Sequence, residues 1–200
     1  MKKHIKNMVS NRCINQVAGI LVDMGIPFQS IELGEVQFEQ QLSMIQELDF
    51  QFKLKQVGLD LIGDPKMLLS ERIKLVIIQM IHYSDEHIKT NFSVYLSEKT
   101  NLNYTYLSNV FRTENNMTIQ QFIIIHKIER IKELLLYGEL NLSEISYKMH
   151  YSSIAHLSNQ FKKITGLSPT EYRHLDVIHR IPLEDIGKTG ITPLKQHKSA

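Results

Sequence analysis

The sequence has few of the features that would mark an enzyme, a secreted protein or a membrane protein. It contains a single cysteine, Cys13, which excludes an internal disulfide and is typical of a reducing compartment. No hydrophobic run approaches ~18 residues, and no signal-like segment follows the N-terminus, so we expect a cytoplasmic protein without a membrane span. The sequence also lacks glycine-rich phosphate-binding motifs, a G-x-S-x-G motif and an H-E-x-x-H motif. We therefore expect neither an enzyme nor a bound cofactor.

The charge of the chain is nearly balanced and unevenly distributed. The net charge is +2, with −1 on residues 1–85 and +3 on residues 86–200, and the second part also carries seven of the nine histidines. This bias permits nucleic-acid binding but is weaker than in a typical strong nucleic-acid binder. A hydrophobic content of 42% with 22% charged residues is ordinary for a globular chain, which excludes wholesale disorder.

Hydrophobic periodicity in residues 1–64 alternates between strand and helix, which predicts a small βαββαβ domain of ferredoxin-like arrangement. Gly25 is expected to end the first helix, and Gly34-Glu35 to form the turn of a hairpin. The expected strands cover residues 4–9, 30–33, 36–38 and 59–62, and the expected helices cover residues 13–24 and 41–56.

The rest of the chain is expected to be helical, which makes the whole protein α+β. Asp64-Pro65 interrupts the pattern, so residues 65–90 are assigned to a connecting helix, over 70–82, and a polar loop. Residues 91–175 then form an all-α domain, and residues 176–200 an irregular tail. Capping boxes are expected at Thr118–Gln121, Asn141–Glu144 and Ser168–Glu171.

A duplication lies within the expected helical domain. Leu-Ser-Asn-Val-Phe at 107–111 recurs as Leu-Ser-Asn-Gln-Phe at 157–161, and at the same offset Phe122 corresponds to Tyr172. Repetition of a helix, a polar turn and a second helix indicates two helix-turn-helix units in one chain. A long helix over residues 119–137 joins them.

The second helix of each unit has one apolar and one polar side. The apolar side holds Leu107, Val110 and Phe111 in the first copy, and Leu157 and Phe161 in the second. Hydroxyl, amide and basic side chains on the opposite side are those that reach base edges and phosphates in a major groove. A solvated surface would explain one such helix, but two copies in matching register favour DNA recognition. The polar side holds Thr105, Ser108, Asn109 and Arg112 in the first copy, and Ala155, Ser158, Asn159 and Lys162 in the second.

Residues 91–173 resemble the DNA-binding domain of AraC-type transcription regulators, most strongly over the gapless stretch 142–173. The resemblance implies seven helices, with two recognition helices in successive major grooves of double-stranded DNA and a linker helix that sets their separation. It also implies a sequence-specific transcription regulator. By position, it assigns base-facing roles to Thr105, Ser108, Asn109, Ala155, Ser158 and Asn159, and phosphate contacts to Arg112, Lys127, Lys162 and Lys163.

Two positions depart from the family pattern. His150 replaces a glycine at a turn where a positive φ is often required, and Asn116 replaces the glycine after the first recognition helix. Asparagine adopts the left-handed conformation more readily than histidine does. We expect neither change to disrupt the fold.

Residues 1–64 resemble the heavy-metal-associated domain, in which a Cys-x-x-Cys pair holds a soft metal ion. Here Ser10 replaces the first cysteine of the pair, which leaves Cys13 with Met8 and His4 as weak additional ligands. We therefore expect no metal site, although Cys13 at a helix start could still be a reactive thiol. The domain would then form a homodimer or bind a protein partner, acting through the helix at 70–82. The alternative function is a soft-metal chaperone or a metal-responsive sensor.

Overall fold

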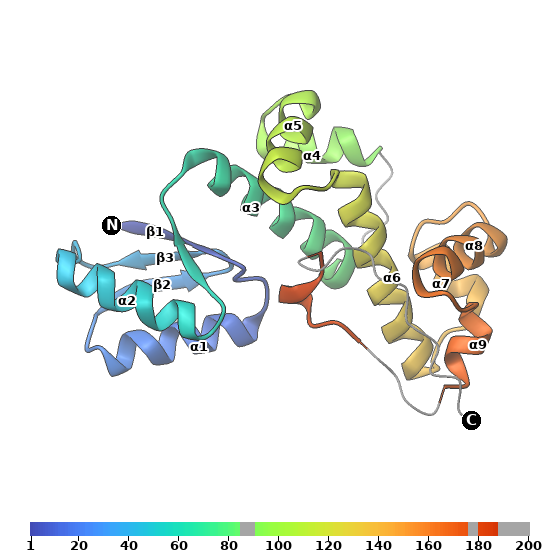
Figure 1. Ribbon diagram of the computed structural model, residues 1–200, viewed down its shortest axis with the longest axis horizontal. Coiled ribbons are helices and arrows are strands. Elements are labelled where there is room, and N and C mark those ends of the chain that lie inside the picture. Colours follow the sequence, from blue (N-terminus) through green and yellow to red (C-terminus); the bar gives the residue numbers. More distant parts are fainter. Residues whose placement is uncertain (85–90, 176–179, 188–200) are drawn as a thin grey trace. The chain divides into compact units, whose positions relative to one another are not determined.

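The computed structural model describes residues 1–84, 91–175 and 180–187 (Figure 1). These residues form two compact units. The first combines residues 1–78 with 91–118, and the second combines residues 79–84 with the described residues from 119 onward. No helix in the described part of the chain is both long and apolar enough to span a membrane.

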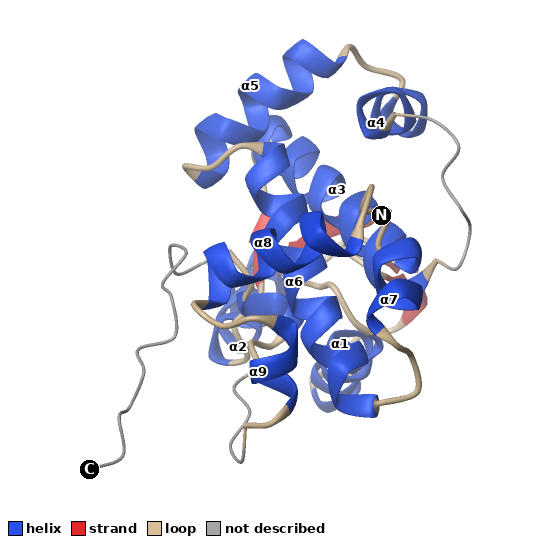
Figure 2. Ribbon diagram, turned by 90° about the vertical axis from the view of Figure 1, so that its right-hand side faces the viewer, coloured by secondary structure: helices blue, strands red, loops and turns tan. Residues whose placement is uncertain are grey.

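The first unit contains a four-stranded sheet in the order β2-β3-β1-β4, in which each neighbouring pair is antiparallel. The expected order of elements, βαββαβ, is confirmed. Figure 2 shows that helices make up most of the described chain, with the strands in red. The elements are β1 (Lys2–Lys6), α1 (Asn11–Asp23), β2 (Phe28–Glu32), β3 (Glu35–Phe38), α2 (Met44–Gln56) and β4 (Asp60–Ile62).

The core of this domain joins the sheet to one side of each of its two helices. Val17 and Leu21 of α1 lie one turn apart and are fully buried, as are Phe50 and Leu54 of α2. Phe50 contacts the ring of Phe38 edge to face, with ring centroids 5.8 Å apart. These contacts join α2 to β3. Helix α1 ends as expected, because Gly25 takes a φ of +64° directly after it.

Helix α3 (Pro65–Ile78) differs from the expected connector. Asp64-Pro65 begins the helix instead of interrupting it, because proline suits the first helical position and Asp64 Oδ1 accepts a hydrogen bond of 2.8 Å from the Lys66 amide. The helix continues as a π-helical turn, η1 (Gln79–Tyr83). The apolar side of α3 faces the protein's own core, where Ile73 and Ile77 are fully buried.

Helix α3 packs against α4 (Phe92–Thr100) and α5 (Tyr104–Asn115), and it also contacts β1 and β4. The sequence predicted that this helix only connects the two domains, but α3 packs directly against helices of the helical domain. Six helices lie between residues 91 and 175, so among the described residues the seven helices implied by the resemblance are reached only when α3 is counted.

The second unit is built around α6, whose bounds Ile119–Tyr137 match the expected helix. Around it lie α7 (Leu142–Lys148), α8 (Ile154–Thr165) and α9 (Pro169–Arg173), followed by a 3-10 turn, η2 (Leu183–Asp185). The expected capping boxes at Asn141/Glu144 and Ser168/Glu171 are present. Most of the expected tail, at 176–179 and 188–200, lies outside the described residues. The core of this unit includes Ile128, Ile131, Leu135, Ile145, Leu157, Phe161 and Tyr172.

Candidate nucleic-acid interface

Helices α4 and α5 form the first helix-turn-helix unit. Asn103 caps α5 by accepting a 2.8 Å hydrogen bond from the Thr105 amide, and Asn116 ends the helix in the left-handed conformation at φ 54°. Asparagine thus takes the role expected of the missing glycine. The helix buries Leu107, Val110 and Phe111, as the sequence predicted.

The predicted DNA-facing residues of α5 lie on its outer side. Thr105, Asn109 and Arg112 are exposed, and Ser108 is half-buried. The inner side is held by α3, where Asn115 Nδ2 donates a 2.7 Å hydrogen bond to the hydroxyl of the buried Ser70. The position of this recognition helix therefore depends on α3.

Helices α7 and α8 form the second unit. His150, in the turn between them, has a φ of 55°, so this position does require the positive φ expected from its place in the pattern. Ser153 caps α8 by accepting a 3.1 Å hydrogen bond from the His156 amide, and Gly166 ends the helix at φ 82°. The histidine adopts a backbone conformation that glycine would adopt without steric cost.

The outer side of α8 carries the second set of predicted residues. Ala155, Asn159, Lys162 and Lys163 are exposed, and Ser158 is half-buried. Leu157 and Phe161 face the core and are fully buried. Each predicted base-facing residue therefore lies on an accessible or partly accessible side of its helix.

Lys127 of α6 lies where the resemblance implied a phosphate contact, but its ammonium group is engaged within the protein. Nζ donates a 2.7 Å hydrogen bond to the main-chain oxygen of Met149, the residue that ends α7. It also lies 5.1 Å from the centroid of the Tyr151 ring. Burial lowers the pKa of Lys127. This lysine stabilises the end of α7 and the turn before α8.

Tyr151 extends this connection to the recognition helix. Its hydroxyl donates a 2.6 Å hydrogen bond to Gln160 Oε1 on α8, and burial raises the pKa of Tyr151 to about 12. The phenol therefore stays protonated and remains a donor at neutral pH. Sequence reasoning did not identify this pair, since nine residues separate the two partners and neither lies on the polar side of the repeat.

Two further residues at the start of α8 were not singled out by the sequence. His156 is exposed, with Nδ1 3.1 Å from the Ser152 hydroxyl and its ring 5.1 Å from the ring of Tyr151. Ile154, the first residue of the helix, is 43% exposed. An exposed isoleucine beside Ala155 offers apolar contact of the kind that a thymine methyl group accepts in a major groove.

On the inner side of α6, the fully buried His126 lies beside a half-buried histidine, His82. His82 Nε2, from η1, lies 3.3 Å from His126 Nδ1. Burial and the positive charges of Arg130 and Arg180 together lower the pKa of His82 to about 4, against the opposing effect of Glu133. His82 is therefore neutral at neutral pH.

The candidate metal ligands do not form a suitable donor set. Cys13 and Met8 are buried in the domain core with Ile5, and the Cys13 sulfur lies 3.3 Å from the Ser10 hydroxyl. His4 lies on the opposite side of β1 from Ile5, and its Nδ1 is 3.8 Å from Glu35 Oε2. One thiol beside a hydroxyl does not fit a soft metal ion. No group of three or more His, Cys, Asp or Glu side chains in the described ranges is arranged to bind a metal.

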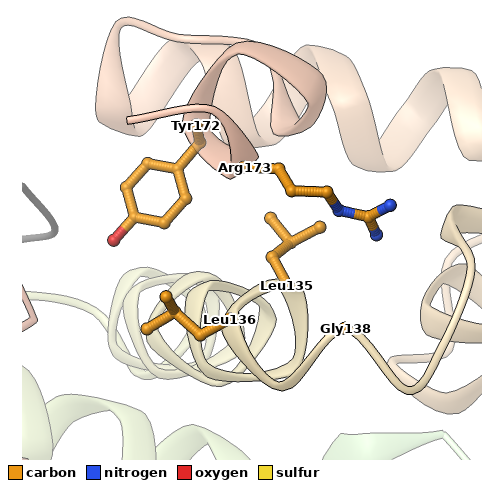
Figure 3. Close-up of a pocket in the computed structure, with 5 residues that line it drawn as sticks. All are labelled: Leu135, Leu136, Gly138, Tyr172 and Arg173. Carbon is orange, nitrogen blue, oxygen red and sulfur yellow. The ribbon is translucent and has the colours of Figure 1, made fainter. Parts of the chain in front are cut away.

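Two cavities among the described residues are large enough to admit a small molecule. One, of about 270 Å³, lies between α6 and α9 and is lined by Leu135, Leu136, Gly138, Tyr172 and Arg173 (Figure 3). It is small for a metabolite site and offers no pair of groups for acid–base catalysis. A second, of about 450 Å³, lies between the sheet and α3. Its inner carboxylate, Glu71, already binds Lys74 at 2.7 Å and the Asn7 amide at 3.1 Å.

Comparison with known proteins finds a domain family that matches the helical part of the chain. A helix-turn-helix domain family matches residues 96–174. The Msm operon regulatory protein of Streptococcus mutans is 32% identical over 78 residues, which cover 39% of this chain and 28% of that protein. The xylose operon regulatory protein of Escherichia coli K12 is 29% identical over 101 residues, which cover 50% of this chain and 26% of that protein. The chain thus spans less than a third of the length of either relative.

Among solved structures, the chain is similar to the C-terminal domain of AraT, a response regulator from Geobacillus stearothermophilus. The two share 27% sequence identity with a TM-score of 0.48, over 58% of this chain and 89% of that structure.

Proposed function

Because residues 96–174 form a helix-turn-helix domain similar to those of AraC-type regulators, we propose that this protein is a sequence-specific DNA-binding transcription regulator and not an enzyme. The observation that carries the proposal is the doubled unit. Two capped helices, α5 and α8, each bury one apolar side and present hydroxyl, amide and basic groups on the other. Double-stranded DNA is the partner that such a pair of helices fits.

Within this proposal, α5 and α8 enter successive major grooves and read bases through their outer side chains. Arg112, Lys162 and Lys163 are exposed at or near the last turn of their helices and contact phosphates. Lys127 acts mainly by holding the turn before α8, and its phosphate role is secondary. The base-reading residues are Thr105, Ser108, Asn109, Ala155, Ser158 and Asn159.

For the first 64 residues we propose a ferredoxin-like domain related to heavy-metal-associated domains, in which the metal site has been lost. The sheet order β2-β3-β1-β4 supports the fold assignment, and the place of Ser10 beside Cys13 supports the loss. In its place the domain provides a surface for self-association or for a protein partner. We propose residues 1–64 as this N-terminal domain and residues 91–175 as the DNA-binding domain. Helix α3 packs against β1, β4 and α5 and so contacts both.

Selection of binding sites from a random duplex pool with the full chain tests the DNA-binding proposal. The full chain is needed because a fragment that begins at residue 86 would lose α3, against which α5 packs. We expect an enriched site with two short specified blocks about 10 base pairs apart, one for each recognition helix. Insertion of about 5 base pairs between the blocks should greatly reduce affinity, since it rotates one block by half a turn of B-DNA. Binding with no enriched sequence would contradict the proposal.

A further inference from the structure

Helix α2 has an apolar face that nothing in the described chain covers. Its inner side buries Phe50 and Leu54 completely. On the outer side, Met44 is 81% exposed, Ile45 80%, Leu48 61% and Phe52 62%. We call these four residues the α2 stripe.

The α2 stripe is continuous along the helix. Met44, Leu48 and Phe52 follow one another at intervals of four residues, so their side chains form one ridge, and Ile45 lies beside it. Two exposed charged residues border the stripe, since Asp49 lies one turn after Ile45 and Lys55 lies three residues after Phe52. Single exposed apolar residues are common on protein surfaces, but a contiguous ridge of four large ones marks an interaction site.

The size of the α2 stripe suits an interface. Four large side chains that are 61–81% exposed leave roughly 500 Å² of apolar surface, which is in the upper range for a patch on a monomeric protein. Two such surfaces face to face bury about 1,000 Å², the lower limit for a specific protein–protein interface. A second copy of this helix therefore reaches that lower limit when the whole stripe is buried.

The proposed DNA-reading surface does not account for this ridge. The α2 stripe lies outside residues 96–174. The helix at 70–82, through which the domain was expected to act, buries Ile73 and Ile77 within the protein. Nucleic acid would not be held by an uncharged apolar ridge, since its binding depends on neutralising phosphates.

We propose that the α2 stripe is a homodimer interface in which two copies of α2 pack antiparallel across a two-fold axis. The stripe is symmetric about its middle residue, because Met44 and Phe52 lie one turn before and one turn after Leu48. An antiparallel copy places Leu48 against its own counterpart and Met44 against Phe52, as a self-complementary interface requires. The thioether then contacts an aromatic ring, which is a favourable pairing.

The proposed function gives the N-terminal domain a surface for self-association or for a protein partner, and this inference identifies that surface. It does not depend on DNA binding.

The test is sedimentation of the full chain in the absence of DNA, from about 1 to 100 μM. We expect the wild-type protein to dimerise in this range. Leu48→Asp should weaken the dimer at least ~10-fold by burying a charge at its centre. Val22→Asp is the matched control, because Val22 is 69% exposed on α1 and lies outside the stripe. It should leave dimerisation unchanged.

Cross-linking tests the antiparallel arrangement with two positions of nearly equal exposure. Leu48→Cys places a thiol at the two-fold axis and should form a covalent dimer under mild oxidation. Phe52→Cys should not, because the two copies of residue 52 lie about 12 Å apart along the axis. The native Cys13 is buried in both variants.

A wild-type chain that stays monomeric at 100 μM would overturn the inference, whether or not another protein copurifies with it. So would equal effects of Leu48→Asp and Val22→Asp, or cross-linking through residue 52 but not residue 48. A monomer that still selects a DNA site would refute the dimer and leave the proposed function standing.

Discussion

The Nζ atom of Lys127 on α6 donates a hydrogen bond to the main-chain oxygen of Met149, 2.7 Å away. Met149 ends α7, where carbonyl oxygens lack helical partners and carry partial negative charge. A cation from the neighbouring helix therefore stabilises the turn that precedes the second recognition helix. The linker helix thus positions this turn through a side-chain contact as well as through its length.

Replacing Lys127 with methionine separates this positioning role from a phosphate contact. Lys127→Met should lower the free energy of unfolding by about 1–3 kcal/mol, since a hydrogen bond from a charged donor is lost and the Met149 oxygen loses its partner. Cognate DNA affinity should fall with it, while the slope of log affinity against log salt stays unchanged. Denaturant unfolding and salt titrations measure the two quantities. A slope smaller by about one ion would instead identify Lys127 as a phosphate contact.

Base reading and phosphate binding are separated by two exposed residues on α8. Asn159→Ala should cost about 1–3 kcal/mol on the selected site and relax the preference at one base position. Lys163→Ala should weaken selected and random duplexes alike and reduce the salt slope by about one ion. Fluorescence anisotropy with both duplexes at several salt concentrations distinguishes these effects. An equal loss for Asn159→Ala on the two duplexes would contradict its role in base recognition.

Local sequence rules predicted the helices whose ends have their own signals. The bounds of α6 and the capping boxes of α7 and α9 agree with expectation, since each depends on residues within one turn of the helix end. Asp64-Pro65 was misread because proline either interrupts a helix or begins one, and here Asp64 caps a helix that begins at Pro65.

The candidate site was predictable where it depends on the faces of single helices. The outer residues of α5 and α8 followed from periodicity, because an amphipathic helix exposes one side in any packing. The contacts of Lys127 and Tyr151 could not be predicted, since each joins groups from different helices. The α2 stripe was also missed. Helix α2 carries apolar residues on two faces, and the sequence does not show which of the two the rest of the domain buries.

Gly34 should be required in the turn between β2 and β3 for two reasons that can be measured separately. Its φ is +83°, and a Cβ atom there would lie 2.7 Å from Leu75 Cδ1 of α3. Gly34→Ala should therefore lower the free energy of unfolding by about 1–3 kcal/mol. Gly25→Ala is the control, because Gly25 has a φ of +64° and no atom within 4 Å of the added Cβ.

The difference between the two glycine variants gives the cost of displacing Leu75. A double-mutant cycle with Leu75→Ala should show coupling for Gly34→Ala and none for Gly25→Ala. Equal losses in both variants, without coupling, would mean that the Leu75 side chain rotates away at no cost.

Restoring the missing cysteine should create a soft-metal site. In the wild-type chain the hydroxyl of Ser10 lies 3.3 Å from the Cys13 sulfur, so Ser10→Cys would bring two thiols together at the start of α1. We expect the reduced variant to bind Cu(I) or Zn(II) with an affinity orders of magnitude above that of the wild-type chain, because the second thiolate closes a chelate. A competitive chelator titration of both full-length proteins measures this change. Tight stoichiometric binding by the wild-type protein would refute the lost-site interpretation.

The half-buried His82 should make the second unit sensitive to acid. Its pKa is about 4 in the folded protein and 6.5 in the unfolded chain, because burial and the charges of Arg130 and Arg180 disfavour the cation. Above pH 6.5 both states hold a neutral imidazole, and the contribution of this group to stability is constant. As the pH falls from 6.5 towards 4, the unfolded chain takes up a proton that the folded protein does not, so the free energy of unfolding decreases.

A neutral replacement for His82 isolates this effect from the titration of other groups. His82→Gln cannot take up the proton, so the stability of the wild-type protein relative to the variant should fall by about 2 kcal/mol between pH 8 and pH 5. Urea unfolding of both proteins at the two pH values measures this difference, and the titration of shared carboxylates cancels in the comparison. The sign is specific, since a histidine stabilised as a cation would make the wild-type protein relatively more stable at pH 5. A difference that stays the same at both pH values would show that His82 titrates alike in the folded and unfolded states, and that the contact with His126 imposes no cost on protonation.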